Sequence, residues 1–353
     1  MISESSLTKA VERGILTADQ LTQLQSLAQT NGLPGNDPDD EKLRFVTGFS
    51  DIFVTIGIGL FASAVAYFAD TYGEPVRWAA LAVVSWALAE FFTRRRRMAL
   101  PSIVLLCLFA VAVFGAAYLG LNRLSSGDPW HESIPFGVRN WRPAILTSAA
   151  LITLGLVALH YWRFRLPITV AAGAAALAGV VVGLVFIVAP DFADRYAMVI
   201  ILAAGLSIFT LAMRFDLSDP ARITRRTDIA FWLHLLAAPM IVHPMIAILV
   251  LKDADFSASM ALAILAIFVA LGAIAVIVDR RAILVSGLAY AGIAFKTLIT
   301  GVGLTDHAAA ATLLVLGAFV LLLSAGWRPL RAFLLKLLPS GLARRLPHPI
   351  LTP

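Results

Sequence analysis

Residues 75–121 read PVRWAALAVVSWALAEFFTRRRRMALPSIVLLCLFAVAVFGAAYLGL and decide the fold. Two apolar runs, 75–92 and 99–121, stand on either side of Thr93 and the four consecutive arginines Arg94–Arg97. Each run is close to the ~20 residues that a helix needs to cross ~30 Å of hydrocarbon. The stretch therefore predicts two membrane-spanning helices joined by a short basic turn.

The same alternation of long apolar runs and short polar gaps continues along the chain. Hydrophobic residues make up 59% of the 353 residues and charged residues only 14%, whereas soluble domains are roughly a quarter charged. The expected spans are 47–69, 75–92, 99–121, 143–162, 166–188, 195–213, 229–251, 259–278, 282–304 and 306–326. No stretch shows the alternation over ~10 residues that a β-barrel strand would need. The sequence predicts an all-α polytopic membrane protein whose transmembrane domain covers 47–326.

Lysines and arginines cluster in every second gap between the apolar runs, and the gaps between these are acidic or neutral. The segments on one predicted side hold 21 of the 28 lysines and arginines, among them Arg163, Arg165, Arg280 and Arg281. By the positive-inside rule this side is the cytoplasm, and ten crossings then place both termini there. The net charge of +6 is thus a signal of topology. It does not indicate nucleic-acid binding, which needs basic residues clustered on one soluble face.

Residues 1–46 are predicted to form a cytoplasmic helical hairpin followed by a solvated linker at 33–41. Thr17 and Gln20 have the spacing of a capping box, which predicts a helix start at this point. Two helices this short cannot form a stable core alone. We expect the hairpin to dock on the membrane domain or on a partner protein.

Residues 327–353 are predicted to form an amphipathic tail that lies in the inner membrane interface. Its apolar residues fall on one helical arc, and its basic residues Arg328, Arg331 and Lys336 are expected to face anionic headgroups. The apolar residues are Trp327, Leu330, Phe333, Leu334, Leu337 and Leu338.

Two loops are longer than a tight turn. The outer loop 122–142 carries Trp130, His131 and Trp141, which suit either a lid or anchoring in the headgroup belt. The inner loop 214–228 contains Asp219-Pro220, which predicts the start of a short helix. Thr227-Asp228 in the same loop is the expected cap of the seventh span.

The seventh span contains the most unusual residues: His234, Pro239, His243 and Pro244. Each proline removes a helical hydrogen bond, so the span is expected to be kinked twice, with the carbonyls of Leu235 and Met240 left free. Such a broken helix is how many transporters build a midplane binding site. A purely structural role, with the histidines bonding across helices, is the alternative. The two histidines are nine residues apart, which places them on opposite faces of a regular helix and does not suit a metal site.

Lys296 is the one basic residue deep in a predicted span. An unpaired charge at this depth costs at least about 2.5–3.5 kcal/mol. Lys296 and His243 lie equally far from the cytoplasmic ends of their spans, so both could line one cavity. The alternative is that Lys296 extends its ammonium group toward the outer interface.

Further local patterns have simple structural explanations. Glu90 and Arg94 have the spacing of an ion pair on one helix face. Gly179 and Gly183 form a GxxxG pattern, which predicts close packing on another helix of this chain or of a second copy. Cys107, the only cysteine, lies in mid-span. No catalytic motif is readable, so neither an enzyme nor a cofactor or metal is predicted.

Four stretches resemble uncharacterised bacterial multi-spanning inner-membrane proteins that are classed as a domain of unknown function. These are Val11-Glu12-Arg13-Gly14-Ile15-Leu16-Thr17-Ala18-Asp19-Gln20, Thr227-Asp228-Ile229-Ala230-Phe231-Trp232-Leu233-His234-Leu235-Leu236-Ala237-Ala238-Pro239, the basic turn Asp279-Arg280-Arg281 and Gly326-Trp327-Arg328-Pro329-Leu330-Arg331. The resemblance implies a bacterial inner-membrane location and supplies no activity.

The functional hypothesis from sequence is a permease-like transporter of a small solute. His243 and Lys296, with His234 and the backbone at Pro239 and Pro244, are its predicted substrate-binding residues. The alternative is a membrane scaffold or sensor that does not transport and that acts through its N-terminal hairpin and C-terminal tail.

Overall fold

The computed structural model describes residues 11, 13, 14, 16, 17, 19–23, 48–126, 143–219, 222, 224–250, 257–301, 303, 306–339 and 346. The chain divides into two compact units, Met1–Lys42 and Leu43–Pro353. The second unit contains the whole membrane domain.

The membrane domain is built from helices alone in the part of the chain that the structure describes. They are α3 (Phe49–Asp70), α4 (Glu74–Ala89) with its continuation η1 (Glu90–Arg95), α5 (Ala99–Ser126), α6 (Pro143–Phe164), α7 (Pro167–Val188), α8 (Pro190–Leu217), α9 (Arg225–Val250), α10 (Ala258–Val278), α11 (Ala282–Gly301), α12 (Ala308–Ala325) and α13 (Trp327–Leu337). Ten of these segments are long and apolar enough to span a bilayer. The predicted all-α polytopic fold is confirmed, with each predicted span matched by one helix. Residues 127–142 of the loop predicted at 122–142, with its aromatic residues, lie outside the described residues.

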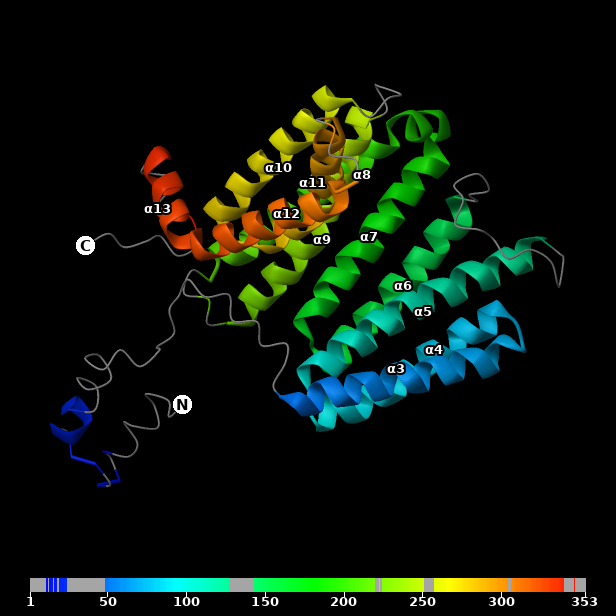
Figure 1. The fold of residues 1–353 in the computed structure, drawn as a ribbon. Helices are drawn as coiled ribbons and strands as arrows, with labels where there is room; N and C mark the ends of the chain where they lie inside the picture. Colours follow the sequence, from blue (N-terminus) through cyan, green and yellow to red (C-terminus); the bar gives the residue numbers. More distant parts are fainter. Residues whose placement is uncertain are drawn as a thin grey trace. The chain divides into compact units, whose positions relative to one another are not determined.

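The helices pack in two groups that meet along α7 (Figure 1). In the first group α3, α4 and α5 contact one another, α5 packs on α6, and α6 packs on α7. In the second group α8 packs on α9, α9 on α11, and α11 on both α10 and α12. Helix α7 contacts both α8 and α9, and α13 packs on α10 and α12. Many large apolar side chains point outward from the helices, for example Phe49 and Leu60, as expected where lipid is the solvent.

One end of the domain gathers the charged turns, and we call it the basic end. Glu90 of η1 contacts Arg163 at the end of α6. Arg165 of the α6–α7 turn lines the same cleft as Arg225 at the start of α9. Asp216 at the end of α8 pairs with Arg280 in the α10–α11 turn. These contacts place the ends of α4, α6, α8 and α9, together with the α6–α7 and α10–α11 turns, at the same end of the domain.

The predicted GxxxG contact is confirmed, and it lies within the chain. A Cβ atom built on Gly183 of α7 would lie 3.3 Å from the Cα atom of Thr147 in α6, and one built on Gly179 would lie 3.4 Å from the Cβ atom of Ala150. Both glycines therefore face α6. The absence of their side chains lets the two helix backbones approach closely, which is the main way that helices associate in lipid.

The capping box predicted near the N-terminus is also confirmed. The Thr17 amide donates to Oε1 of Gln20 at 2.9 Å, and the Gln20 amide donates to Oγ1 of Thr17 at 3.2 Å. Gly14, with φ +69°, occupies the left-handed region just before it. Most of the predicted hairpin and all of its linker at 33–41 lie outside the described residues, so that domain assignment stays a prediction.

Helix α13 forms where the amphipathic tail was predicted, but one basic residue faces the other way. Arg331 is 1% exposed and Trp327 is 3% exposed. The prediction that Arg331 faces lipid headgroups is therefore wrong. Arg331 points toward the carboxylate of Asp279, and a partner of this kind offsets the desolvation cost of a buried guanidinium. Leu330, Phe333 and Leu337 remain exposed on the opposite side.

Candidate functional site

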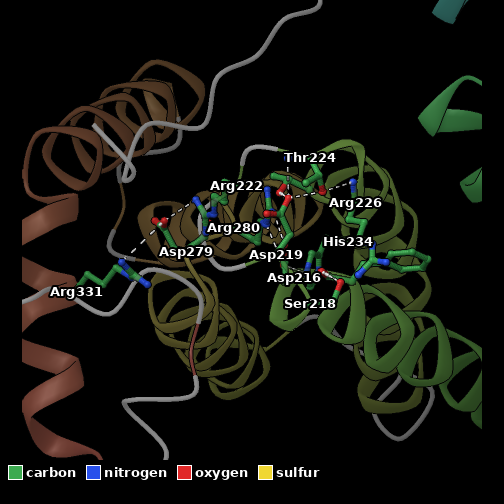
Figure 2. A network of polar contacts seen from close by, with 12 residues as sticks. Asp216, Ser218, Asp219, Arg222, Thr224, Arg226, His234, Asp279, Arg280 and Arg331 are labelled. Carbon is green, nitrogen blue, oxygen red and sulfur yellow. Dashed lines mark hydrogen bonds and ion pairs between the residues drawn. The ribbon is translucent and has the colours of Figure 1, made fainter. Parts of the chain in front are cut away.

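The α10–α11 turn is the centre of a buried group of charged residues that we call the ionic network. Its members are Asp216, Arg222, His234, Asp279, Arg280, Trp327 and Arg331 (Figure 2 labels all except Trp327). They come from α8, the α8–α9 loop, α9, the α10–α11 turn and α13.

The turn itself is closed by a Schellman motif. Asp279 has φ 61° and ψ 49°, its amide donates to the carbonyl of Val276 at 3.2 Å, and the amide of Arg280 donates to the carbonyl of Ala275 at 2.8 Å. Glycine is the usual residue at this left-handed position. An aspartate there accepts some backbone strain, and in this protein its carboxylate has partners on other elements.

Asp279 joins the α8–α9 loop and α13 to the turn. Its Oδ1 accepts a hydrogen bond of 2.7 Å from the indole N–H of Trp327, and its Oδ2 lies 2.8 Å from Nη1 of Arg222. Nη2 of Arg222 also donates to the Asp279 carbonyl at 3.3 Å. Nη1 of Arg331 approaches the same carboxylate at 4.0 Å. The guanidinium of Arg281 lies over the face of the Trp327 ring, with 5.1 Å between its Cζ atom and the ring centre.

Asp216 joins α8 to α9 and to the same turn. Its Oδ2 accepts a 3.1 Å hydrogen bond from Nε of Arg280, and its Oδ1 accepts one from Nη2, which gives a two-pronged contact. His234 of α9 lies with Nε2 at 2.9 Å from Oδ2. An ionised carboxylate only accepts, so Nε2 carries the proton. Asp216, His234 and Arg280 are each at most 2% exposed.

A neighbouring carboxylate organises the start of α9. Oδ2 of Asp219 accepts hydrogen bonds from the amide of Thr224 at 2.9 Å, from its hydroxyl at 2.6 Å, and from the hydroxyl of Thr227 at 2.9 Å. The hydroxyl of Thr224 accepts from the Arg226 amide, so Thr224 is the N-cap of α9. The predicted cap at Thr227-Asp228 is wrong by one turn, because Asp219 supports a cap nearer the chain start.

The charges of the ionic network neutralise one another, because its carboxylates and guanidinium groups are buried together. Asp216 and Asp279 face the three guanidinium groups of Arg222, Arg280 and Arg331 in surroundings with little access to water. Removing one member of a buried ion pair typically costs about 3–5 kcal/mol, because the other charge is left buried without compensation. The network can therefore hold these elements together, and it can also separate them if its charges become hydrated.

His234 is the one predicted site residue that belongs to the ionic network. Its Nδ1 atom is buried and has no hydrogen-bond partner in the described part of the chain. The ring of Phe209 lies edge-on to its imidazole, with 5.1 Å between centres. The other predicted residues lie elsewhere.

His243 and Lys296 are on adjacent helices but do not make the same contacts. Nδ1 of His243 is hydrogen-bonded to the hydroxyl of Tyr290 in α11. Lys296 follows Tyr290 by six residues, is exposed, and has no hydrogen bond or ion pair among the described residues. The structure thus brings the seventh and ninth spans together through His243 and Tyr290.

The two prolines do not interrupt α9. The helix is continuous from Arg225 to Val250, with Pro239 and Pro244 inside it, so the expected broken backbone is not found. The carbonyl of Met240, which Pro244 leaves without its helical donor, packs against Gly205 of α8. A Cβ atom built on Gly205 would lie 2.9 Å from this carbonyl oxygen. Neighbouring helices commonly accommodate a proline in this way.

The Glu90 pairing also differs from the expectation. Its two carboxylate oxygens accept from Nε and Nη2 of Arg163 at 2.7 Å and 2.8 Å, whereas Arg94 approaches only to 3.4 Å. The predicted pair with Arg94 is present, but the main partner comes from α6. The π-helical η1 ends α4 and places Glu90 beside that helix.

Sequence reasoning missed the role of the acidic and tryptophan members of the ionic network. It assigned Arg222 and Arg280 to topology and Arg331 to the lipid headgroups. A usable signal was present: Asp216 and Asp279 each stand close to an arginine on the side where positive charge was expected. An acidic residue within a basic turn indicates an ion pair with one of the arginines on that side. Among the described residues, no three His, Cys, Asp or Glu side chains are grouped so that they could hold a metal ion.

Comparison of the chain with family models, with curated proteins and with solved structures gave no match. The resemblance to uncharacterised inner-membrane proteins therefore stays a prediction. What stands is a multi-pass α-helical membrane protein with a buried ionic network at its basic end.

Proposed function

We propose that the chain is a permease-like transporter of a small solute and that the ionic network is a gate at its basic end. The observation that supports this most is the burial of Asp216 near the end of α8, His234 inside α9 and Arg280 in the α10–α11 turn, in mutual contact. Charges at helix ends could face water at little cost. Ionisable groups placed inside a membrane domain instead are costly to keep there and commonly mark a pathway.

The ionic network is suited to act as a gate because its ion pairs join different structural elements. The pair of Asp216 with Arg280 links α8 to the α10–α11 turn, and that of Arg222 with Asp279 links the α8–α9 loop to the same turn. Opening means that α10, α11 and α13 move away from α8 and α9, with water taking the place of the lost partners. Interfaces of this kind switch between two discrete arrangements.

The solute would be held farther along α9. His243 follows His234 by nine residues, which is about 13.5 Å along the helix axis. The pair of His243 with Tyr290 offers hydrogen-bonding groups between α9 and α11 at that depth. Lys296, farther along α11, is retained as a second polar group for the solute when the gate is open.

We infer that the basic end faces the cytoplasm, with both termini on that side. The support is the charge bias of the sequence, in which one predicted side holds 21 of 28 lysines and arginines. The location in a bacterial inner membrane is part of the same proposal.

An uptake experiment with a mixture of candidate solutes tests the proposal. Purified full-length protein is reconstituted into vesicles, which are then exposed to a defined mixture of amino acids, sugars, nucleosides and small carboxylic acids. Mass spectrometry of the vesicle contents reports entry. At least one solute should accumulate above protein-free vesicles, and His243→Ala should lower its rate roughly tenfold, the effect of losing about one hydrogen bond to the solute.

Lys296→Met and Arg214→Gln serve as comparisons in the same assay. Lys296→Met should also slow uptake if Lys296 contributes to binding, whereas Arg214, an exposed residue at the end of α8, should be replaceable without effect. The proposal fails if no solute enters above the blank, or if uptake is the same in wild type, His243→Ala and Lys296→Met.

A scaffold or sensor is the second candidate, and α13 is the observation that favours it. The network fixes Trp327 and Arg331 of this helix while Leu330, Phe333 and Leu337 stay exposed. Deleting residues 1–40 separates the two candidates. A transporter keeps its uptake after the deletion, whereas a scaffold that works through the N-terminal hairpin loses its co-purifying partner.

A further inference from the structure

A second polar feature of the basic end is a cleft of about 410 Å³ between the two helix groups. Tyr161 and Trp162 of α6, Arg165 and Pro167 of the α6–α7 turn, and Arg225 and Ile229 of α9 line it. None of these residues takes part in the ionic network. We call this feature the arginine cleft.

The backbone of the α6–α7 turn holds Arg165 in place. Its φ is 53°, and its amide donates to the carbonyl of Tyr161 at 2.8 Å, which caps α6. Leu166 is extended, and Pro167 begins α7. A residue with a side chain is strained in the left-handed region, where glycine would be at ease. The turn nevertheless presents an arginine to the cleft.

Within the part of the chain that the structure describes, the two arginines of the cleft have no counter-charge, unlike those of the ionic network. Among the described residues, no acidic side chain lines the cleft. In that part of the chain neither Arg165 nor Arg225 forms a hydrogen bond or an ion pair through its guanidinium, whereas nearby Arg163 is paired with Glu90. Two guanidinium groups that share one cleft repel each other, and an anion between them removes that repulsion.

The remaining walls of the cleft indicate what kind of anion fits. Trp162 is 72% exposed and Tyr161 is 42% exposed, and both residue types prefer the headgroup level of a bilayer. Ile229 and Pro167 add apolar surface. One turn from Trp162 along α6, the exposed side chain of Leu159 continues this apolar surface toward mid-membrane. A ligand with a phosphate at one end and a hydrocarbon body matches these walls.

We propose that the arginine cleft binds the phosphate headgroup of an anionic phospholipid of the phosphatidylglycerol class. The two guanidiniums bind the phosphate oxygens in the two-pronged geometry that arginine favours. The aromatic side chains flank the glycerol region, and the acyl chains lie along the exposed face of α6. Because α6 and α9 belong to different helix groups, the bound lipid joins the two groups at this end.

Native mass spectrometry of the full-length protein in detergent tests this directly. Phosphatidylglycerol and phosphatidylcholine with identical acyl chains are titrated in parallel. Phosphatidylcholine also carries a phosphate, but its quaternary ammonium group cancels the negative charge that the two guanidiniums would bind. Wild type should therefore bind phosphatidylglycerol roughly tenfold more tightly, and the double substitution Arg165→Gln with Arg225→Gln should remove that preference. Arg165→Lys with Arg225→Lys should restore part of it by restoring the charge, which guards against a folding defect.

The matched control is Arg95→Gln with Arg97→Gln, which removes two exposed charges from the same end but away from the cleft. This control should keep the full preference. A final arm adds millimolar sodium phosphate, which should not displace the lipid. The proposal is overturned if the preference survives the cleft substitutions, if the control loses it equally, or if free phosphate displaces the lipid completely. None of these results depends on whether the protein transports a solute.

Discussion

The two helix groups of the membrane domain are held together by different forces. In the first, from α3 to α7, helices meet through small residues and ring contacts: His160 lies among Trp86, Phe109 and Phe164. Its main interhelical ion pair, Glu90 with Arg163, is about one-third exposed. In the second, from α8 to α13, the ionic network joins the helix ends with side chains that are almost fully buried.

The difference shows two solutions to one physical problem. Lipid tails are as apolar as leucine, so little hydrophobic force draws helices together inside a bilayer. Close packing solves the problem for α6 and α7 and leaves a rigid contact. Buried charge pairs solve it for the second group, and they can exchange their partners for water. We therefore expect the first group to be the fixed part and the second the moving part.

The largest effect is expected from breaking the ionic network. Arg280→Gln leaves the carboxylate of Asp216 buried without its main partner, so the free energy of unfolding should fall by about 3–5 kcal/mol. Arg214→Gln, which removes the same charge from an exposed site at the end of α8, should change it by less than about 0.5 kcal/mol. Denaturant unfolding in detergent micelles measures both. Equal effects of the two substitutions would contradict the role assigned to Arg280.

A smaller effect is expected from disturbing the packed group. Gly183→Ala places a methyl group against Thr147, whose Cβ atom would be 3.2 Å away, and crowding of this kind typically costs about 1–3 kcal/mol. Gly179→Ala makes only an ordinary contact of 3.4 Å with Ala150 and is the matched control. In the same assay, the free energy of unfolding should be lower for Gly183→Ala than for Gly179→Ala. The reverse order would show that α6 and α7 do not pack as described.

The exposed ion pair of the first group should matter less again. Glu90→Gln removes the carboxylate that binds Arg163 at 2.7 Å, but partial exposure limits the expected loss to about 1 kcal/mol. The effect should weaken further in high salt, because solvent ions screen exposed pairs. A loss as large as that of Arg280→Gln would erase the contrast between the two groups.

The smallest effect on stability is expected at Lys296. Its side chain is exposed on α11 and has no hydrogen bond or ion pair within the described residues. Lys296→Met should therefore leave the unfolding free energy within about 0.5 kcal/mol of wild type, whatever it does to uptake. A marked loss of stability would reveal a partner for Lys296 and would move this residue into the structural framework.

Features set by neighbours in the chain were predictable from the sequence. The ten spans follow from run length, the close packing of Gly183 on another helix from a four-residue spacing, and the bond between Thr17 and Gln20 from a three-residue spacing. The spacing did not say that this other helix is α6. The amphipathic pattern also located α13. Each of these depends on a repeat or an offset that is visible within a few turns of helix.

The ionic network was not predictable in the same way. Arg280 and Asp216 are 64 residues apart, and Arg222 and Asp279 are 57 apart. A count of charges by loop records their sign but carries no information on which residues meet. Arg331 shows the consequence, since an arginine on an amphipathic helix was expected in the headgroups and is buried beside Asp279. The prediction of a broken α9 failed for a related reason, because it took no account of the neighbouring helix. Gly205 of α8 accommodates the carbonyl that Pro244 leaves without a donor.

Thiol accessibility at position 237 tests the gate most directly. Ala237 is buried between α7, α8 and α9, one turn beyond His234, and Ala237→Cys in a Cys107→Ser background places a single probe behind the network. A membrane-impermeant maleimide applied from the basic end should leave this cysteine unlabelled while the network is intact. Labelling should rise roughly tenfold when Asp216→Asn and Arg280→Gln are combined, because the neutral pair remains folded without locking the helices. Unchanged labelling in that folded double variant would contradict a gate made of these residues.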